Sequence, residues 1–338
     1  MNAWEDTTLV GIYTITPLHL GSGQVSGAVD LPITRDSATG FPLIPATSLK
    51  GVARENVSLA SKKDDPRIEE LLFGKTIDAA LTDADGEGDQ DNANTATGQL
   101  CFSEARLVAY PARSLNRPFV HITCPLILER LWREARAFGV DFDCQFRVPE
   151  GAEGVWASVS SQALDRQPLI IEDLLIDRER VVFSNKTLEL AKTLASLIPA
   201  SDAATQDRFI DNLVVLRDAD FNELMERIIP IRARTKLTGG KTTDKWKNPE
   251  TNKEESGNLW YEEHLPTDCL FASFVGARRY WRSAVAEGHG QSPVATFNGF
   301  AEKMSYVQIG GDETVGHGIC YWHFATAVAG GASGEGQA

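Results

Sequence analysis

The sequence lacks any long apolar run, and no stretch approaches the roughly eighteen apolar residues that a membrane-spanning helix requires. Its first residues, MNAWEDTTLV, contain acids, and they have neither the basic start nor the apolar stretch of a secretory leader. We therefore expect a cytoplasmic protein that has no membrane partner.

Cysteine is also scarce, and the few that occur are scattered along the chain. No two of them have the Cys-x-x-Cys spacing of a zinc or redox site. We expect all of them to be buried, reduced thiols. They are Cys101, Cys124, Cys144, Cys269 and Cys320.

The loops that bind nucleotides are missing as well. The sequence has no GxxxxGK[ST] phosphate loop, and its glycine-rich segment near residue 310 is not part of a strand–GxGxxG–helix unit. It also shows no catalytic triad and no histidine spacing typical of a metal cluster. These absences disfavour an enzyme that acts on small molecules.

Positive charge is in deficit overall, with 33 Lys and Arg against 47 Asp and Glu and a net charge of -14. Such a balance argues against a nucleic-acid partner, because Lys and Arg drive phosphate binding. The distribution reverses this impression. Between Arg227 and Lys253 the cations greatly outnumber the acids Asp244 and Glu250, whereas residues 83–91 contain acids and no cation. This segregation is typical of a protein with a separate RNA-binding surface.

Local patterns predict strands and helices in mixed order. β-Branched and aromatic residues predict strands at 8–16, 100–110, 119–124, 269–275, 305–309 and 319–324. Apolar residues at helical spacing predict helices in SLKGVAREN, around 128–135 and 190–197, and at 209–229, 277–286 and 294–304.

Three segments interrupt this order. Residues 76–98 are rich in Asp, Gly, Asn and Thr, which bury too little surface to offset the entropy of ordering. Residues 227–259 carry the basic run around Gly239-Gly240 and predict a protruding hairpin. The end, AGGASGEGQA, predicts a flexible tail.

The order of elements favours the α+β class, with an antiparallel sheet that has helices on one face and long excursions between strands. A ferredoxin-like topology fits this order. The expected division is a core at 1–75, 99–150 and 260–326, an acidic loop at 76–98, an α-rich insertion at 151–226, a basic hairpin at 227–259 and a disordered tail at 327–338.

Four segments are more specific than these patterns. They read TPLHLGSGQVSGAVDLPITRD, TGFPLIPATSLKGVARE, HITCPLILERL and QIGGDETVGHGI. Taken together, they resemble the RAMP superfamily and, within it, the repeated backbone subunits of type III-B CRISPR (Cmr) effector complexes. The resemblance implies a modified ferredoxin-like, RRM-related core, a thumb hairpin, and copies stacked along a CRISPR guide RNA beside other subunits of the complex. It also implies that bound single-stranded target RNA is cut at regular intervals.

The segment SLKGVARE supplies the first predicted RNA contacts. Lys50 and Arg54 are four residues apart, so a helix would present both cations on one face. Ser48 is placed to cap that helix or to donate to a phosphate. The alternative is a pair of solvated cations.

The glycine-rich loop and the basic hairpin supply the others. Residues without Cβ let backbone amides approach phosphates closely, although an ordinary hairpin connection has the same composition. The residues carried over as RNA contacts are Gly310, Gly311 and Gly316 in the loop and Arg232, Arg234 and Lys236 in the hairpin.

Asp30 carries the catalytic prediction, because by the resemblance it matches the acidic residue used for cleavage. RNA supplies its own nucleophile, the 2′-hydroxyl, so the protein needs only to align the strand and manage protons and phosphate charge. The carboxylate of Asp30 would accept that proton or hold a divalent cation, Mg²⁺ or Mn²⁺, at the scissile phosphate. The expected products are a 2′,3′-cyclic phosphate and a 5′-hydroxyl. A turn residue is the structural alternative.

Other residues receive auxiliary roles. His19 in TPLHLGSG is predicted to be an acid or an RNA contact, with a structural loop histidine as the alternative. Tyr261, Glu262 and Glu263 match a family segment near the cleavage site. His317 lies in the glycine-rich loop, where its neutral state near pH 7 weakens a phosphate contact.

Two further functions stay open. One is a non-catalytic RNA scaffold of the same complex, in which Asp30 only shapes its loop. The other is a RAMP endoribonuclease that processes the guide precursor and uses histidine as its acid or base. The basic hairpin and Asp30 favour the effector subunit.

Overall fold

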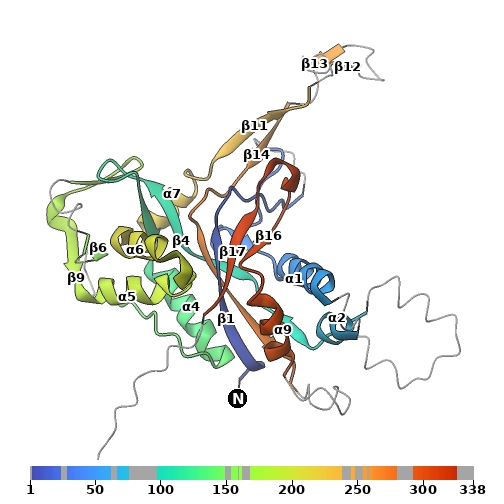
Figure 1. Cartoon of the computed structure of the whole chain (residues 1–338). Coiled ribbons are helices and arrows are strands. Elements are labelled where there is room, and N and C mark those ends of the chain that lie inside the picture. Colours follow the sequence, from blue (N-terminus) through green and yellow to red (C-terminus); the bar gives the residue numbers. More distant parts are fainter. Residues whose placement is uncertain are drawn as a thin grey trace, which may run out of the picture.

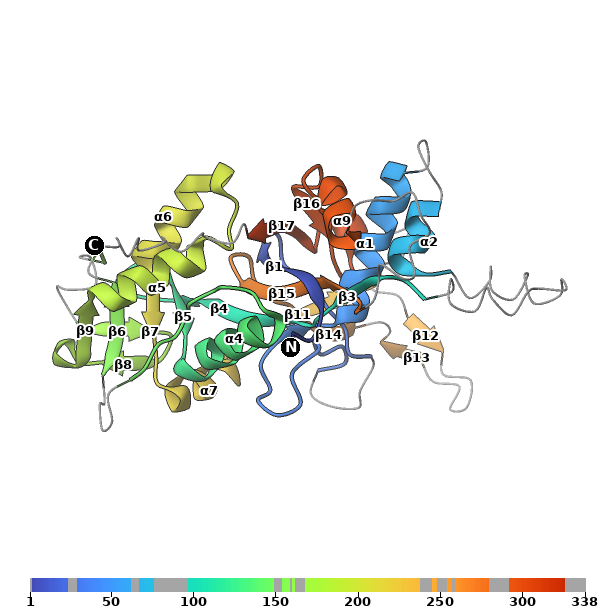
Figure 2. The same ribbon diagram turned by 90° about the horizontal axis from the view of Figure 1, so that it is seen from below.

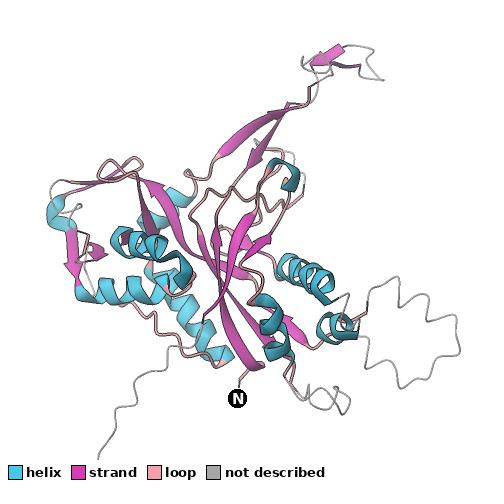
Figure 3. Cartoon of the chain, in the orientation of Figure 1, coloured by secondary structure: helices cyan, strands magenta, loops and turns pink. Residues whose placement is uncertain are grey.

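A computed structural model describes residues 2–23, 29–61, 67–75, 97–148, 154–158, 160–161, 168–237, 245–247, 254–256, 259–279 and 292–325. Nearly all of the predicted acidic loop lies outside these residues, as do most of the hairpin tip and the predicted tail. Helices surround a large twisted sheet (Figures 1 and 3), so the chain contains both kinds of element, as predicted.

The main sheet has eleven strands, in the order β16-β17-β1-β15-β4-β5-β10-β6-β9, with β2 paired to β4 and β3 to β15. It is mixed, because β10 is parallel to β5 and β6 is parallel to β9. Its strands are β1 Glu5–Thr14, β2 Leu43–Ile44, β3 Leu100–Phe102, β4 Ala105–Arg113, β5 Phe119–Thr123, β6 Val155–Ser158, β9 Val181–Ser184, β10 Leu213–Val215, β15 Leu270–Ala277, β16 Tyr306–Gln308 and β17 Ile319–Ala325.

In Figure 2, α1, α2 and α9 lie near one end of the sheet and α5 and α6 near the other. No helix in the described ranges has both the length and the apolar composition to cross a membrane. The helices are α1 Ala46–Ser61, α2 Arg67–Phe73, α4 Pro125–Phe138, α5 Asn185–Ala195, α6 Ala203–Asn212, α7 Asp218–Met225 and α9 Pro293–Ala301, with 3₁₀ turns η3 Arg178–Arg180, η4 Ala200–Asp202 and η5 Glu313–Val315.

Strand β1 lies between β15 and β17, and both of its faces are covered. Val10 and Ile12 belong to the apolar core that includes α1 and α9, whereas Leu9 and Tyr13 belong to the core that includes α4, α5 and α6. Between these residues, a Cβ on Gly11 would lie 1.9 Å from the Leu197 carbonyl oxygen. Glycine is therefore required where the chain after α5 crosses the strand.

Several predicted elements are confirmed with small shifts. The strands at 8–16, 119–124, 269–275, 305–309 and 319–324 correspond to β1, β5, β15, β16 and β17. The helices in SLKGVAREN and around 128–135, 190–197 and 294–304 correspond to α1, α4, α5 and α9. All five cysteines are free thiols, and all but Cys101 are buried.

Other predictions are wrong. The run 100–110 forms two strands, because Ser103 and Glu104 lie outside both β3 and β4. Ala277 ends β15 instead of starting a helix. The rest of that predicted helix lies largely outside the described residues. The run 209–229 is not one helix, since β10 separates α6 from α7. Pairing with β5 and β6 decides the conformation of the short apolar run Leu213–Val215.

The predicted α-rich insertion is a mixture of strands and helices. Besides α5, α6 and α7, it contains β6, β9 and β10, which extend the main sheet. It also contains a two-stranded sheet formed by β7 Leu169–Ile171 and β8 Leu174–Ile176. The insertion is therefore continuous with the core sheet through β10, which lies beside β5.

A narrow two-stranded ribbon projects from the body (Figure 1). It consists of β11 Ile231–Thr235 and β14 Leu259–Glu263, which pair antiparallel from Ile231 opposite Glu263 to Thr235 opposite Leu259. The short strands β12 Lys245–Lys247 and β13 Glu254–Ser256 pair beyond it. We call β11 and β14 the ribbon and residues 310–318 the glycine loop.

Candidate functional site

Asp30 is fixed against the ribbon. Its backbone amide donates to the Tyr261 carbonyl at 3.1 Å, and its Oδ2 accepts from the Tyr261 amide at 2.8 Å. Leu31 forms a parallel bridge with Glu262, which continues the same attachment. Since no other described residue donates to the carboxylate, its Oδ1 is left for a ligand. The structure thus brings Asp30 and the backbone of Tyr261 together.

Tyr261 and Glu262 point to opposite sides of β14. The Tyr261 side chain is exposed, whereas Glu262 is only 4% exposed. Both oxygens of Glu262 are engaged: Oε1 accepts from Trp260 Nε1 at 2.5 Å, and Oε2 lies 2.6 Å from Arg234 Nε. Glu262 therefore holds the ribbon base together. Its auxiliary catalytic role stays a prediction.

Arg234 links the ribbon to the glycine loop. Besides the Glu262 pair, its Nη2 donates to Asp312 Oδ2. Arg232 and Lys236, its neighbours on β11 and just beyond it, are exposed. Among the predicted hairpin contacts for RNA, Arg234 already has two carboxylate partners within the protein, so Arg232 and Lys236 are the more accessible cations.

His19 is a nearly buried residue held by the backbone, with 8% of its surface exposed. Its Nδ1 lies 2.7 Å from the Glu263 carbonyl oxygen, which can only accept, so Nδ1 carries the hydrogen and Nε2 is the free nitrogen. The Glu263 side chain is bound elsewhere, to Arg35 Nη2 at 2.9 Å and to the Ile33 amide at 3.0 Å. These contacts tie the chain on both sides of Asp30 to β14.

The glycine loop packs on the backbone of His19. The Gly311 amide donates to the His19 carbonyl at 2.9 Å. Gly310 has φ 81°, and a Cβ there would lie 2.3 Å from that same carbonyl oxygen. Gly316 has φ 79° and open space around it. The positive φ and the close packing on His19 therefore explain why residue 310 is a glycine. Contact of this loop with RNA remains a prediction.

The cations of α1 have different surroundings. Arg54 Nε donates to Glu69 Oε1 at 2.7 Å and Nη2 donates to the Gly74 carbonyl at 2.8 Å, so this guanidinium joins α1 to α2. Lys50 and Ser48 are half-buried on the same helix. The structure therefore makes Lys50 the better candidate for a phosphate contact.

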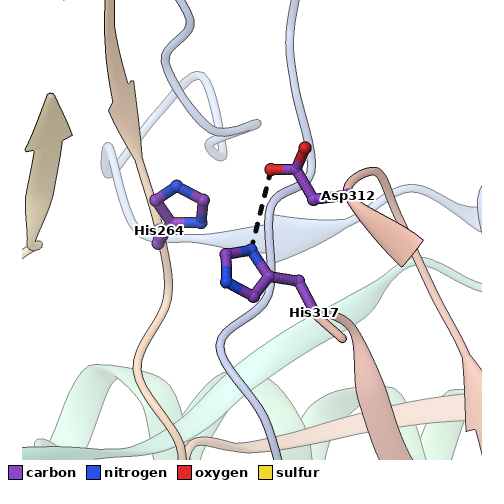
Figure 4. Close-up of side chains that lie close together, drawn as sticks. All are labelled: His264, Asp312 and His317. Carbon is purple, nitrogen blue, oxygen red and sulfur yellow. Dashed lines mark ion pairs between the residues drawn. The ribbon is translucent and has the colours of Figure 1, made fainter. Parts of the chain in front are cut away.

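Three histidines from distant segments meet beside the glycine loop. The ring of His264 lies 5.3 Å from that of His19 and 4.9 Å from that of His317. Burial, together with the imidazoles of His19 and His317, lowers the pKa of His264 to about 4, so it is neutral at pH 7. His317 also lies near Asp312, with 3.6 Å between Nδ1 and Oδ2 (Figure 4).

Although the histidines have no sequence spacing typical of a metal cluster, the fold brings two of them together with an aspartate. Ligand atoms of His264, Asp312 and His317 all lie within 4.8 Å of one another. Sequence reasoning overlooks this group because His264 follows β14, whereas Asp312 and His317 belong to the glycine loop. The only local signal is an Asp five residues before a His among glycines.

Comparison with known proteins gives consistent matches along the chain. Residues 11–321 match the RAMP superfamily. The CRISPR system Cmr endoribonuclease Cmr4 of Pyrococcus furiosus is 30% identical over 317 residues, which cover 92% of this chain and 93% of that protein. A crystal structure of oligomeric Cmr4 from P. furiosus has a TM-score of 0.64 and 25% identity, and covers 95% of this chain and 98% of that one.

A further likeness concerns the fold alone. A chain in the cryo-EM structure of the type III-B Cmr-beta complex bound to cognate target RNA has a TM-score of 0.62. It is 20% identical, and the match covers 96% of this chain and 98% of that one.

Proposed function

This chain belongs to the RAMP superfamily, and from that premise we propose that it is the repeated guide-RNA-binding backbone subunit of a type III-B Cmr effector. In this role it cuts complementary single-stranded target RNA at regular intervals. The observation that carries the proposal is the likeness over nearly the whole chain to a Cmr endoribonuclease. The family match runs from residue 11 to residue 321, so it includes Asp30, the ribbon and the glycine loop.

The proposed core is ferredoxin-like. Six elements occur along the chain in the order βαββαβ, with other elements between them: β1, α1, β4, β15, α9 and β17. In the sheet, the four strands lie in the order β17-β1-β15-β4. All neighbours along this path are antiparallel. The ribbon would then be the thumb, and its projection from the body supports a role in separating segments of the bound RNA duplex.

Asp30 is the proposed catalytic residue. Attack of the RNA 2′-hydroxyl on the adjacent phosphorus forms the 2′,3′-cyclic phosphate, and the 5′-oxygen leaves as a hydroxyl. The bond from Oδ2 to the Tyr261 amide holds the carboxylate in place, so Oδ1 is available to accept the 2′-hydroxyl proton. The exposed ring of Tyr261 next to it is placed to stack on a displaced base.

The carboxylate also fits a divalent cation that is shared with the substrate. Mg²⁺ is usually held by one or two carboxylates together with substrate phosphates. Asp30 offers one such oxygen, and among the described residues it belongs to no group of three or more potential metal ligands. A bound cation would neutralise charge on the scissile phosphate. His19 would act as a positioning residue, because its Nδ1 bond fixes the chain that precedes Asp30.

The proposal is tested by purifying the protein with its co-expressed neighbouring subunits. We expect a defined short RNA to accompany it, and added complementary RNA to be cut at evenly spaced positions into fragments with cyclic phosphate ends. Retained guide without any cutting would support a scaffold instead. Cutting of the guide precursor, with the target left intact, would support a processing endoribonuclease.

Lys50→Glu should weaken guide retention. A phosphate contact on a single strand contributes roughly 0.7 to the slope of log K against log salt, so the reversed charge should reduce that slope as well as the affinity. Filter binding across a salt series measures both. Lys192→Glu, an exposed cation on α5, makes the same charge change away from α1. Equal affinities and slopes for the two variants would assign Lys50 to the solvated surface.

A further inference from the structure

The group formed by His264, Asp312 and His317 has the composition of a transition-metal site. Two imidazoles and one carboxylate are the donors that zinc accepts, whereas Mg²⁺ and Ca²⁺ prefer oxygens alone. The ligand atoms lie within 4.8 Å of one another. Around a tetrahedral ion with bonds of about 2.0 to 2.1 Å, two ligand atoms stand about 3.3 Å apart. The 3.6 Å between His317 Nδ1 and Asp312 Oδ2 is already close to that separation.

One buried nitrogen of each histidine lacks a hydrogen-bond partner among the described residues. The His264 side chain is 1% exposed, and its Nδ1 has no hydrogen-bond partner among the described residues. His317 Nδ1 is buried in the same way. Leaving a buried polar atom unsatisfied is unfavourable, and such atoms are unusual in native structures. An ion that accepts both lone pairs would satisfy both nitrogens.

The surroundings of His264 have the arrangement typical of a metal ligand. Its other nitrogen, Nε2, lies 3.2 Å from Glu262 Oε2, so it donates to a carboxylate. Histidines that bind metals generally make such a bond, which fixes the tautomer and frees the opposite nitrogen. Glu262 is itself held by Arg234 and Trp260.

Nearby charges do not prevent binding. Arg234 Nη2 donates to Asp312 Oδ2, and a carboxylate oxygen that accepts one hydrogen bond keeps a second lone pair for an ion. Arg232 Nη1 lies 3.5 Å from His317 Nε2, but its side chain is exposed and free to turn into solvent. The carboxylates of Glu262 and Asp312 offset the positive charge of these guanidinium groups.

We propose that His264, Asp312 and His317 bind one Zn²⁺-class ion that clamps the glycine loop to the ribbon base. The ion would join the end of β14 to the chain on either side of η5. The site is separate from Asp30, so it does not depend on the proposed nuclease function. Three protein ligands leave a fourth position for water.

The test uses untagged full-length protein from which metal has been removed. ZnCl₂ is added in steps, and the amount of zinc bound and the heat of each addition are measured. We expect one ion per chain, a higher melting temperature with zinc, and no displacement by excess Mg²⁺. Substitution with Co²⁺ should give the visible spectrum of a four-coordinate ion.

Two variants spare the fold while removing a ligand. Asp312 has φ 63°, which asparagine tolerates, so Asp312→Asn is suitable, and His317→Gln alters a partly exposed residue. Each should raise the zinc dissociation constant at least tenfold, with the metal-free melting temperature close to that of the parent. His323→Gln on β17 is the control and should bind normally. Equal zinc affinity for the parent and both ligand variants, or no stoichiometric binding to the parent, would overturn the proposal.

Discussion

Asp30→Asn should stop target cleavage while the guide-bound complex still assembles. Asparagine keeps an oxygen for the Tyr261 amide, which Asp30 Oδ2 now accepts at 2.8 Å, but it removes the negative charge. Loss of a general base or of a well-placed ligand for a cation costs about a hundredfold or more in rate. A surface-loop substitution without lost contacts usually changes stability by less than about 0.5 kcal/mol. The two effects are therefore separable.

The measurement is single-turnover cleavage by the reconstituted complex, over a series of Mg²⁺ and Mn²⁺ concentrations, after guide content and target affinity are matched. Glu189→Gln, an exposed acid on α5, is the control and should cleave normally. If a high cation concentration restores cleavage by the Asp30→Asn complex, the role of the Asp30 carboxylate is to hold the ion. If cleavage is not restored, a role in proton transfer is favoured. Unchanged cleavage would reject the catalytic role of Asp30.

Arg234→Ala should destabilise the base of the ribbon by about 2–4 kcal/mol. The substitution leaves the Glu262 carboxylate, whose side chain is 6% exposed, with Trp260 and His264 as its only side-chain hydrogen-bond partners among the described residues. It also releases Asp312 from the ribbon. Breaking a buried pair by removing one partner costs about 3–5 kcal/mol, and partial exposure of Arg234 reduces that figure.

Urea unfolding in the presence of EDTA measures the loss without a contribution from bound metal. Arg232→Ala, two residues away and exposed, is the matched control and should cost less than about 0.5 kcal/mol. In the double variant Arg234→Ala/Glu262→Gln the neutral amide should recover part of the loss, as a double-mutant cycle would show. Equal losses for Arg234→Ala and Arg232→Ala would mean that the pair contributes nothing to the ribbon base.

Local patterns are enough to predict the central elements. Strand β1 and helices α1, α4 and α9 have residue compositions and spacings that only one secondary structure satisfies. The short run Leu213–Val215 lacks such a signal, because three apolar residues fit a helix or a strand equally well. Its pairing partners, β5 and β6, lie far away in the sequence. Tertiary contacts therefore decide what periodicity leaves open.

The candidate site, like the fold, could be predicted from the sequence only in part. The resemblance and the residue chemistry identify Asp30, His19 and Tyr261 in the sequence. In the structure, Asp30 and His19 are both hydrogen-bonded to the backbone of β14, the strand that contains Tyr261. Neither approach reveals that Arg54 and Arg234 are engaged within the protein, because Glu69 and Asp312 have no special spacing relative to them. The histidine group is missed for the same reason.

The placement of β1 has a consequence for synthesis of the chain. Leu9 pairs with Phe274 on one side and Ala325 on the other, so neither neighbour exists when β1 leaves the ribosome. At roughly 5–20 residues per second, the strand waits on the order of ten seconds or longer for both of them. During that time an apolar strand with unpaired amides on both edges is exposed, which favours chaperone binding or aggregation. Chains that stop before β15 should therefore be cleared by proteolysis before they can join an assembly.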